Sequence, residues 1–312
     1  MMRRYDSSGR LSAVNSTTSP AGADRRIPGW ASALIGALTR DAPAVVTRED
    51  VTQRSVELGL DRDPDATIAE LRRLGWLVAL PVKGTWAFVP PGQEAVMDPY
   101  LPLRAWQARD PDAKFLLAGE AAAWHLGYLD RRSEGRISVW KPSGVRLPDG
   151  LRPHVSIVSI EWGSASPEEL RPSPAFLARR RLDIIRWASG LPAFGPEALL
   201  VQLGGRPASF GPWVDLVAHL EQLVDDCDDD KLAVLLAAQT ASTWQRTAYL
   251  LHSGGQPARG IALLDRKPTS STPKVSFEHP GTAHDDARSV WVPQYHLVDR
   301  LIFPLQKLVG KA

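Results

Sequence analysis

Eight residues between positions 48 and 85 have side chains of the kinds that proteins use to bind duplex DNA. Arginine and lysine bind phosphate oxygens and guanine edges, and threonine and glutamate can hydrogen-bond to base edges. Thr67, Glu70 and Arg73 are predicted to face the bases, and Arg48, Arg54, Lys83 and Thr85 to meet phosphates. The predicted DNA-binding set is Arg48, Arg54, Thr67, Glu70, Arg72, Arg73, Lys83 and Thr85.

A short helix is expected to carry the central members of this set. In "DPDATIAELRRLG", Asp63 is a suitable N-cap, Pro64 suits the first helical position and Gly75 ends the helix. Its polar residues are expected on the faces away from an apolar stripe. The stripe consists of Ile68, Leu71 and Leu74.

Two strands are expected directly after this helix. "WLVALP" and "TWAFVPP" are joined by "VKG", which predicts a hairpin with Gly84 at its tip. Upstream, "PGWASALIGALTRD" predicts an amphipathic helix and "PAVVT" a strand. Thr47 and Asp50 then resemble a capping box at the start of "REDVTQRSVELG". The whole order is that of a winged helix-turn-helix, whose third helix fits a major groove about 12 Å wide.

Charge alone does not favour DNA over protein as the partner of this module. The chain has a net charge of +2, and residues 25–96 hold nine basic and nine acidic residues. Attraction to phosphates would therefore depend on how the cations cluster. A winged helix used for protein contact, with Arg72 and Arg73 on a solvated face, is the alternative.

A second basic surface is possible at Arg179, Arg180 and Arg181. Three adjacent arginines cannot all share one face of a helix, so only part of the run could form a patch. It could bind nucleic acid or an acidic protein, or be a solvated helix face paired with carboxylates. The acidic run Asp225–Asp230 is interpreted as a capped helix junction, with an acidic docking surface as the alternative.

No pattern predicts an enzyme, a metal site or a cofactor. The seven histidines never occur at i, i+4, and a phosphate loop, nucleophile elbow and dinucleotide fingerprint are all absent from the sequence. His125, within "AAAWHLGYL", is interpreted as a packed helical residue. A metal-dependent nuclease would need Glu-x-Lys after an aspartate, and Glu161 in "SIEWGS" lacks that lysine.

Composition predicts a cytoplasmic protein of more than one domain. Its 312 residues are 44% hydrophobic and 23% charged, and the single cysteine, Cys227, excludes an intramolecular disulfide. We expect no signal peptide, and the apolar runs are too short to span a bilayer. Residues 1–24 are predicted to be disordered and 25–96 to form the winged helix-turn-helix. Residues 97–312 are expected to form a larger, mostly helical α+β domain, so the predicted fold class is α+β.

Several stretches of the chain resemble the AbiEi family of bacterial antitoxins, most closely its actinobacterial members. The first is "TREDVTQRSVELGL" with "TIAELRRLGWLVALPVKGTWAFVPPG", which contains Arg73-Leu74-Gly75, Lys83-Gly84, Trp86 and Pro90. Further similarity lies in "FLLAGEAAAWHLGYL", "GLPAFGPEALLVQL" and "RTAYLLHSGG". The resemblance covers residues from about 21 to 312, and it is more specific than a lone winged helix.

The resemblance implies an antitoxin that is also a transcriptional autorepressor. Family members are encoded beside a toxin with a nucleotidyltransferase fold, and their winged helix binds repeats in the operon's promoter. The expected partners are thus operator DNA and the cognate toxin, without a membrane, and the C-terminal domain is associated with antitoxicity. Whether neutralisation involves direct contact with the toxin stays open at this point. The alternative is a module that neutralises its toxin by direct contact without specific DNA binding.

Overall fold

The computed structural model describes residues 25–180, 190–279 and 289–310. These residues form two compact units: one comprises the chain up to Ala113 together with Leu147–Arg152, and the other comprises Lys114–Arg146 together with Pro153 onward. Both helices and strands occur, so the protein is α+β as predicted. The segment expected to be disordered, 1–24, lies outside the described residues.

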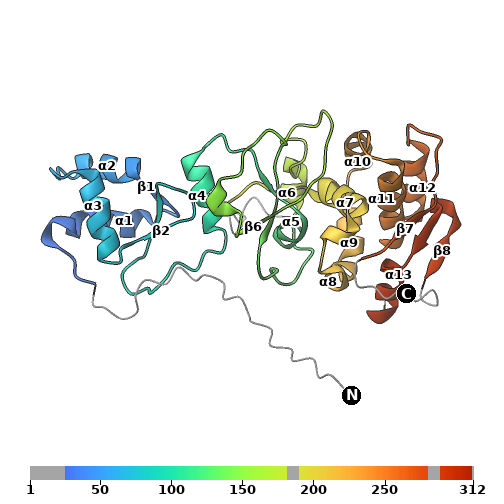
Figure 1. The fold of residues 1–312 in the computed structure, drawn as a ribbon. Helices are drawn as coiled ribbons and strands as arrows, with labels where there is room; N and C mark the ends of the chain where they lie inside the picture. The colour runs from blue at the N-terminus through green and yellow to red at the C-terminus, as the bar shows by residue number, and fades with distance from the viewer. Residues whose placement is uncertain (1–24, 181–189, 280–288, 311–312) are drawn as a thin grey trace, which may run out of the picture. The chain divides into compact units, whose positions relative to one another are not determined.

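The first unit has the element order that the sequence predicted for a winged helix-turn-helix (Figure 1). Its three strands form an antiparallel sheet in the order β1-β3-β2, with Val46 opposite Trp86 and Leu77 opposite Phe88. The elements are η1 (Gly29–Ala31), α1 (Ser32–Asp41), β1 (Val46–Thr47), α2 (Arg48–Glu57), α3 (Pro64–Arg73), β2 (Leu77–Ala79), β3 (Thr85–Phe88), α4 (Leu101–Arg109) and η2 (Asp149–Leu151).

Local signals explain the helix starts in this unit. The Thr47 hydroxyl accepts a hydrogen bond from the Asp50 amide, and the Asp50 carboxylate accepts one from the Thr47 amide at 2.7 Å, which completes the predicted capping box. Asp63 caps α3 by accepting from the Ala66 amide at 2.8 Å. The unit extends past the expected boundary at residue 96, because α4 contacts β3.

A hydrophobic core joins the first three helices and the sheet of the first unit. Its buried residues come from η1, α1, β1, α2, α3 and the hairpin region, and the rings of Trp76 and Phe88 stack with centroids 6.4 Å apart. Its members are Ala31, Leu34, Ile35, Leu38, Val46, Val51, Ile68, Leu71, Trp76, Leu77 and Phe88.

The second unit is mostly helical and contains two small sheets. The first sheet has the order β4-β5-β6, with β5 and β6 parallel, and the second has the order β7-β9-β8, with β7 and β9 parallel. The strands are β4 (Leu116–Leu117), β5 (Ile137–Trp140), β6 (Val155–Ile157), β7 (Val275–Phe277), β8 (Val290–Val292) and β9 (Leu297–Asp299).

Helix α11 (Ala241–Ser253), the longest helix among the described residues, packs against α7 (Pro196–Gly205) and α12 (Pro257–Asp265). Close approach of α7 and α11 requires Gly204, because an added Cβ would lie 2.3 Å from the Thr247 hydroxyl oxygen and 2.9 Å from its backbone nitrogen. The other helices are α5 (Gly119–His125), α6 (Pro174–Arg179), η3 (Pro207–Ser209), α8 (Trp213–Ala218), α9 (Leu220–Asp225), α10 (Asp229–Leu236), η5 (Pro293–Tyr295) and α13 (Ile302–Leu308).

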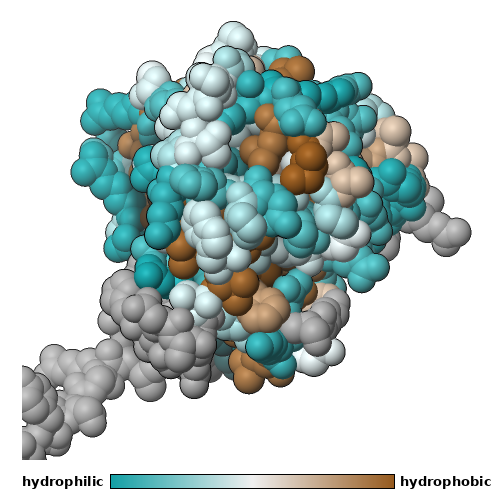
Figure 2. Space-filling model, turned by 90° about the vertical axis from the view of Figure 1, so that its right-hand side faces the viewer, coloured by the Kyte–Doolittle hydropathy of each residue, from teal (hydrophilic) through white to brown (hydrophobic). Residues whose placement is uncertain are grey.

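The surface of the second unit mixes polar and apolar residues. Figure 2 shows hydrophobic patches separated by hydrophilic residues on one face of the molecule. Large exposed hydrophobic residues occur on α10, α12, β8 and α13, where Val234, Ile261, Trp291 and Leu308 are 40–73% exposed. Among the described residues, none of the helices combines the length and the apolar character that a membrane crossing requires.

Candidate nucleic-acid interface

Helix α3 is held in place by one buried face. Ile68 is 4% exposed and Leu71 is fully buried in the core of the first unit. Burying an apolar side chain of this size stabilises a fold by roughly 1.5–3 kcal/mol. Gly75 adopts a left-handed conformation, φ 78°, directly after the helix, which lets the chain turn into the hairpin. The helix therefore packs against the core of the first unit through one face, and this packing fixes its position in the unit.

Thr67 lies on the buried face, so the expectation that it contacts bases is wrong. Its side chain is 1% exposed, and its hydroxyl has no hydrogen-bond partner among the described residues. The buried stripe includes position 67 beside positions 68 and 71, which makes it wider than the apolar residues alone indicated.

The opposite face of α3 is open to solvent along its length. Ala66, Ala69, Arg72 and Arg73 are exposed, and Glu70 is partly buried. Two alanines leave the middle of this face without bulky side chains, so a flat surface or a groove wall could approach the helix backbone closely. Ala66 and Ala69 were not predicted as contact residues, although their spacing from Arg73 is helical and could have identified them.

Two of the predicted cations on the helices are paired with neighbouring carboxylates. Arg73 contacts Glu70 at 2.7 Å, one turn earlier on α3, and Arg48 contacts Asp65 at 2.8 Å and 3.1 Å. The hydrogen bond and charge of Asp65 raise the pKa of Arg48, and the same hydrogen bond lowers the pKa of Asp65. Both pairs are solvent-exposed, so phosphates could compete for these arginines at little cost in free energy.

Arg54 is engaged inside the unit. Its side chain is 18% exposed and contacts Asp41 at 3.1 Å and Asp50 at 3.6 Å. These pairs connect the end of α1 to the start of α2. The residue thus has a role in joining the two helices, and it contributes little charge to the face of α3 that is open.

The hairpin after α3 carries one exposed cation near its tip. Lys83 is exposed and precedes Gly84, whose φ of 81° permits the tight turn. Thr85, which was expected to meet phosphates, is 1% exposed, and its hydroxyl donates to the Val82 carbonyl at 2.6 Å. That expectation is wrong, because Thr85 starts the central strand of the sheet and its side chain closes the turn from inside.

Arg72 and Lys83 differ from the other cations of the set. Among the described residues neither makes an ion pair or a side-chain hydrogen bond to a protein group. A guanidinium fork can bind guanine O6 and N7 or a phosphate, and an ammonium group can bind a phosphate as a point charge. The open face of α3 and the hairpin tip therefore offer two unpaired cations and one exposed, exchangeable arginine.

The second predicted basic surface is partly neutralised. Arg179 contacts Asp226 at 2.9 Å, and Arg180 lies 3.6 Å from the same residue and donates to the Leu126 carbonyl at 3.1 Å. Asp226 also accepts from the Tyr128 hydroxyl at 2.8 Å. Arg181 lies outside the described residues. The two described arginines thus have carboxylate partners, as in the alternative of a paired helix face.

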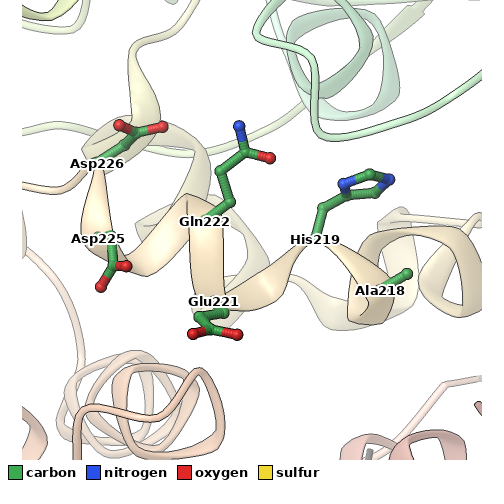
Figure 3. A pocket seen from close by; sticks show the side chains of 6 residues that line it. All are labelled: Ala218, His219, Glu221, Gln222, Asp225 and Asp226. Carbon is green, nitrogen blue, oxygen red and sulfur yellow. The ribbon is translucent and has the colours of Figure 1, made fainter. Parts of the chain in front are cut away.

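The acidic run at residues 225–230 forms a helix junction with internal partners. Asp228 caps α10 by accepting from the Lys231 amide at 2.9 Å, Asp229 contacts Arg259 at 2.7 Å, and Asp230 contacts Arg266 at 2.8 Å. Asp225 and Asp226 end α9 and line a shallow depression (Figure 3). The other residues that line it are Ala218, His219, Glu221 and Gln222.

The described residues hold no group of three or more His, Cys, Asp or Glu side chains that could bind a metal ion. His125 is 9% exposed, and its Nδ1 lies 2.8 Å from the Ala121 carbonyl one turn earlier, so it is the packed helical histidine that was predicted.

Comparison with known proteins places these features in a family. Residues 113–253 match the family model described as the AbiEi antitoxin C-terminal domain. Among solved structures, the chain is similar to the crystal structure of the RV2827C protein from Mycobacterium tuberculosis. The two are 60% identical with a TM-score of 0.85, over 94% of this chain and 99% of that one. The chain belongs to the AbiEi antitoxin family.

Membership supports an antitoxin role in a toxin–antitoxin system, as the resemblance implied, and the AbiEi antitoxin family is not a family of enzymes. An antitoxin family also implies a toxin partner. No curated protein matches the chain. The matched model begins at the boundary between the two units, so the α3 face lies in the part of this AbiEi protein that precedes it.

Proposed function

We propose that this antitoxin represses its own operon by binding promoter DNA through α3 and the β2–β3 hairpin, which acts as the wing. The observation that carries the proposal is the division of α3 into two faces. One face is sealed in the core through Thr67, Ile68 and Leu71, and the other exposes two alanines and two arginines. A helix with an open, small-residue face beside a basic hairpin has the shape that major-groove binding needs.

In this binding mode each exposed group has a distinct contact. Arg72 and Arg73 reach base edges or phosphates from the last turn of α3, and Lys83 reaches a phosphate beside the groove. Glu70 holds Arg73 before binding and can accept a hydrogen bond from cytosine N4 when DNA displaces the arginine. Ala66 and Ala69 allow the helix to approach thymine methyl groups. Each good bidentate base contact would discriminate by roughly 1–3 kcal/mol.

The proposed partners are double-stranded operator DNA in the cytoplasm and a cognate toxin with a nucleotidyltransferase fold. Affinity for DNA would come mainly from phosphate contacts, so it should fall steeply with added salt. Promoter repeats would bring two protomers onto one operator.

The proposal is tested with Arg73→Ala combined with Lys83→Ala in a shift assay on the DNA directly upstream of the gene. We expect weaker binding by the double variant. The matched control is Arg131→Ala with Lys307→Ala, which changes the net charge equally but lies in the second unit. Equal affinities for all three proteins would contradict the assigned contacts.

A protein-interaction module is the second candidate, and the acidic start of α3 favours it. Asp63 and Asp65 are exposed at the end of the helix that would otherwise approach phosphates first. This candidate predicts a stable complex with the neighbouring gene product, measured by co-purification, together with equal affinity for upstream and unrelated DNA.

A further inference from the structure

The connection between β5 and β6 contributes a segment to the first unit. Both strands belong to the second unit, but Leu147–Arg152, which lies between them in sequence, belongs to the first. This segment contains the short helix η2, with Leu151 fully buried and Asp149 paired to Arg152 at 3.0 Å. We call Leu147–Arg152 the strap.

The strap approaches the wing closely at Gly150. A Cβ added to Gly150 would lie 1.9 Å from the Pro81 carbonyl oxygen and 2.9 Å from the Pro81 carbonyl carbon. No real Cβ contact is that short, so any side chain at position 150 requires the backbone of one segment to move. Because Gly150 does not have a positive φ, space and not backbone conformation is what demands glycine here.

Pro81 belongs to the turn that carries the wing cation. It follows β2 by two positions and precedes Lys83 by two. The next residue, Val82, is 4% exposed, and its carbonyl accepts hydrogen bonds from the Thr85 amide and hydroxyl at 3.3 Å and 2.6 Å. The turn is thus held by the hydrogen bonds from Thr85 and lies against the strap at Pro81.

We propose that the strap positions the wing for DNA binding, with Gly150 as the positioning residue. Its contact with Pro81 fixes the turn that holds Lys83, so displacement of the strap moves the wing cation and weakens the phosphate contact. In sequence the strap is joined to β5 through residues 141–146 and to β6 through residues 153–154. The effect on DNA rests on the proposed function; the effect on wing order does not.

The test compares Gly150→Ala with Gly144→Ala. Gly144 lies in the same connection, and a Cβ added to it would have no atom within 4 Å, so its variant controls for the change of residue type. Cleavage by endoproteinase Lys-C after Lys83 reports the order of the wing without DNA, and cleavage after Lys114 is the internal reference. Titration of the upstream DNA at several salt concentrations reports the wing's contact with phosphate.

We expect Gly150→Ala to speed cleavage after Lys83 by at least about fivefold relative to Lys114, since proteolysis follows the open population. Its salt slope for DNA binding should fall by about 1. Gly144→Ala should match the parent in both measurements. If Gly150→Ala does not fold, Leu151→Ala removes the buried anchor without adding a clash and is measured in its place.

Cleavage after Lys83 at the parental rate in the Gly150 variant would contradict the proposal that the strap orders the wing. Faster cleavage with unchanged DNA affinity would overturn its role in DNA binding. If the parent itself does not bind the upstream DNA, the proposed function fails, and the cleavage rates still decide whether the strap orders the wing.

Discussion

The salt dependence of DNA binding gives a quantitative test of the two unpaired cations, Arg72 and Lys83. The perturbation is Arg72→Ala with Lys83→Ala. Neither residue has a protein ion-pair partner among the described residues, so their removal leaves no uncompensated carboxylate behind. The loss of binding should therefore reflect DNA contacts with folding unaffected, and the change in salt slope should count the phosphate contacts among them.

The magnitude follows from counterion release. Each lost phosphate contact reduces the slope of log K against log salt by about 0.9, so the double variant should lose about 1.8 in slope. Between 50 and 200 mM salt, the parent's advantage over the variant should then shrink by about twelvefold, which is the fourfold change in salt raised to that slope difference.

The assay is fluorescence anisotropy with labelled upstream DNA at four or more salt concentrations. The charge-matched control, Arg131→Ala with Lys307→Ala, should keep the parental slope. Parallel lines for the parent and the Arg72/Lys83 variant would refute the reasoning, because they would show that neither side chain displaces a counterion.

Three further predictions concern buried or partly buried positions. Thr67→Val should leave thermal stability and DNA affinity near the parental values, because the Thr67 hydroxyl is buried without a partner and valine has the same shape. Gly204→Ala should lower the free energy of unfolding in urea by about 1–3 kcal/mol through overpacking. Gly205→Ala should not, since its nearest neighbour would be at 3.4 Å. Burial lowers the pKa of His252, so its neutral form stabilises the fold above pH 6.5, and that contribution is lost as the pH falls below this value. The melting temperature of His252→Gln should therefore depend less on pH between pH 7 and 5 than that of the parent.

Each of these predictions has an outcome that would contradict it. If the Thr67→Val protein folds but does not bind DNA, the Thr67 hydroxyl is needed for DNA binding after all. Equal unfolding free energies for the two glycine variants would mean that α7 and α11 separate at no cost. A parental pH profile in His252→Gln would show that the pKa of this histidine does not differ between the folded and unfolded chain.

Local signals allowed much of the first unit to be predicted from sequence. Capping residues act within one turn, so Asp63 and the Thr47–Asp50 box determined where α2 and α3 begin. The hairpin followed from strand residues on either side of Gly84. The second unit was predicted only as a mostly helical α+β domain, without the bounds of its helices and strands.

Long-range packing explains what the sequence could not predict. Thr67 and Thr85 are polar, but α3 is covered on a stripe wider than its apolar residues, and β3 is the central strand of its sheet. The parallel pairing of β7 with β9 joins short segments about twenty residues apart, and a pairing between such distant segments has no signal in the local sequence. No local sequence signal predicts that the strap packs against the wing, because Gly150 and Pro81 are far apart in the sequence.

The most direct test of the central claim is the ratio of two affinities of the full chain at one salt concentration near 150 mM. One is for the DNA upstream of its own gene, and the other is for a shuffled duplex of the same length and composition. Repression through the open face of α3 predicts a ratio of about a thousand or more, as for specific DNA-binding proteins. A ratio near one would contradict the account and leave the winged helix as a protein-contact module.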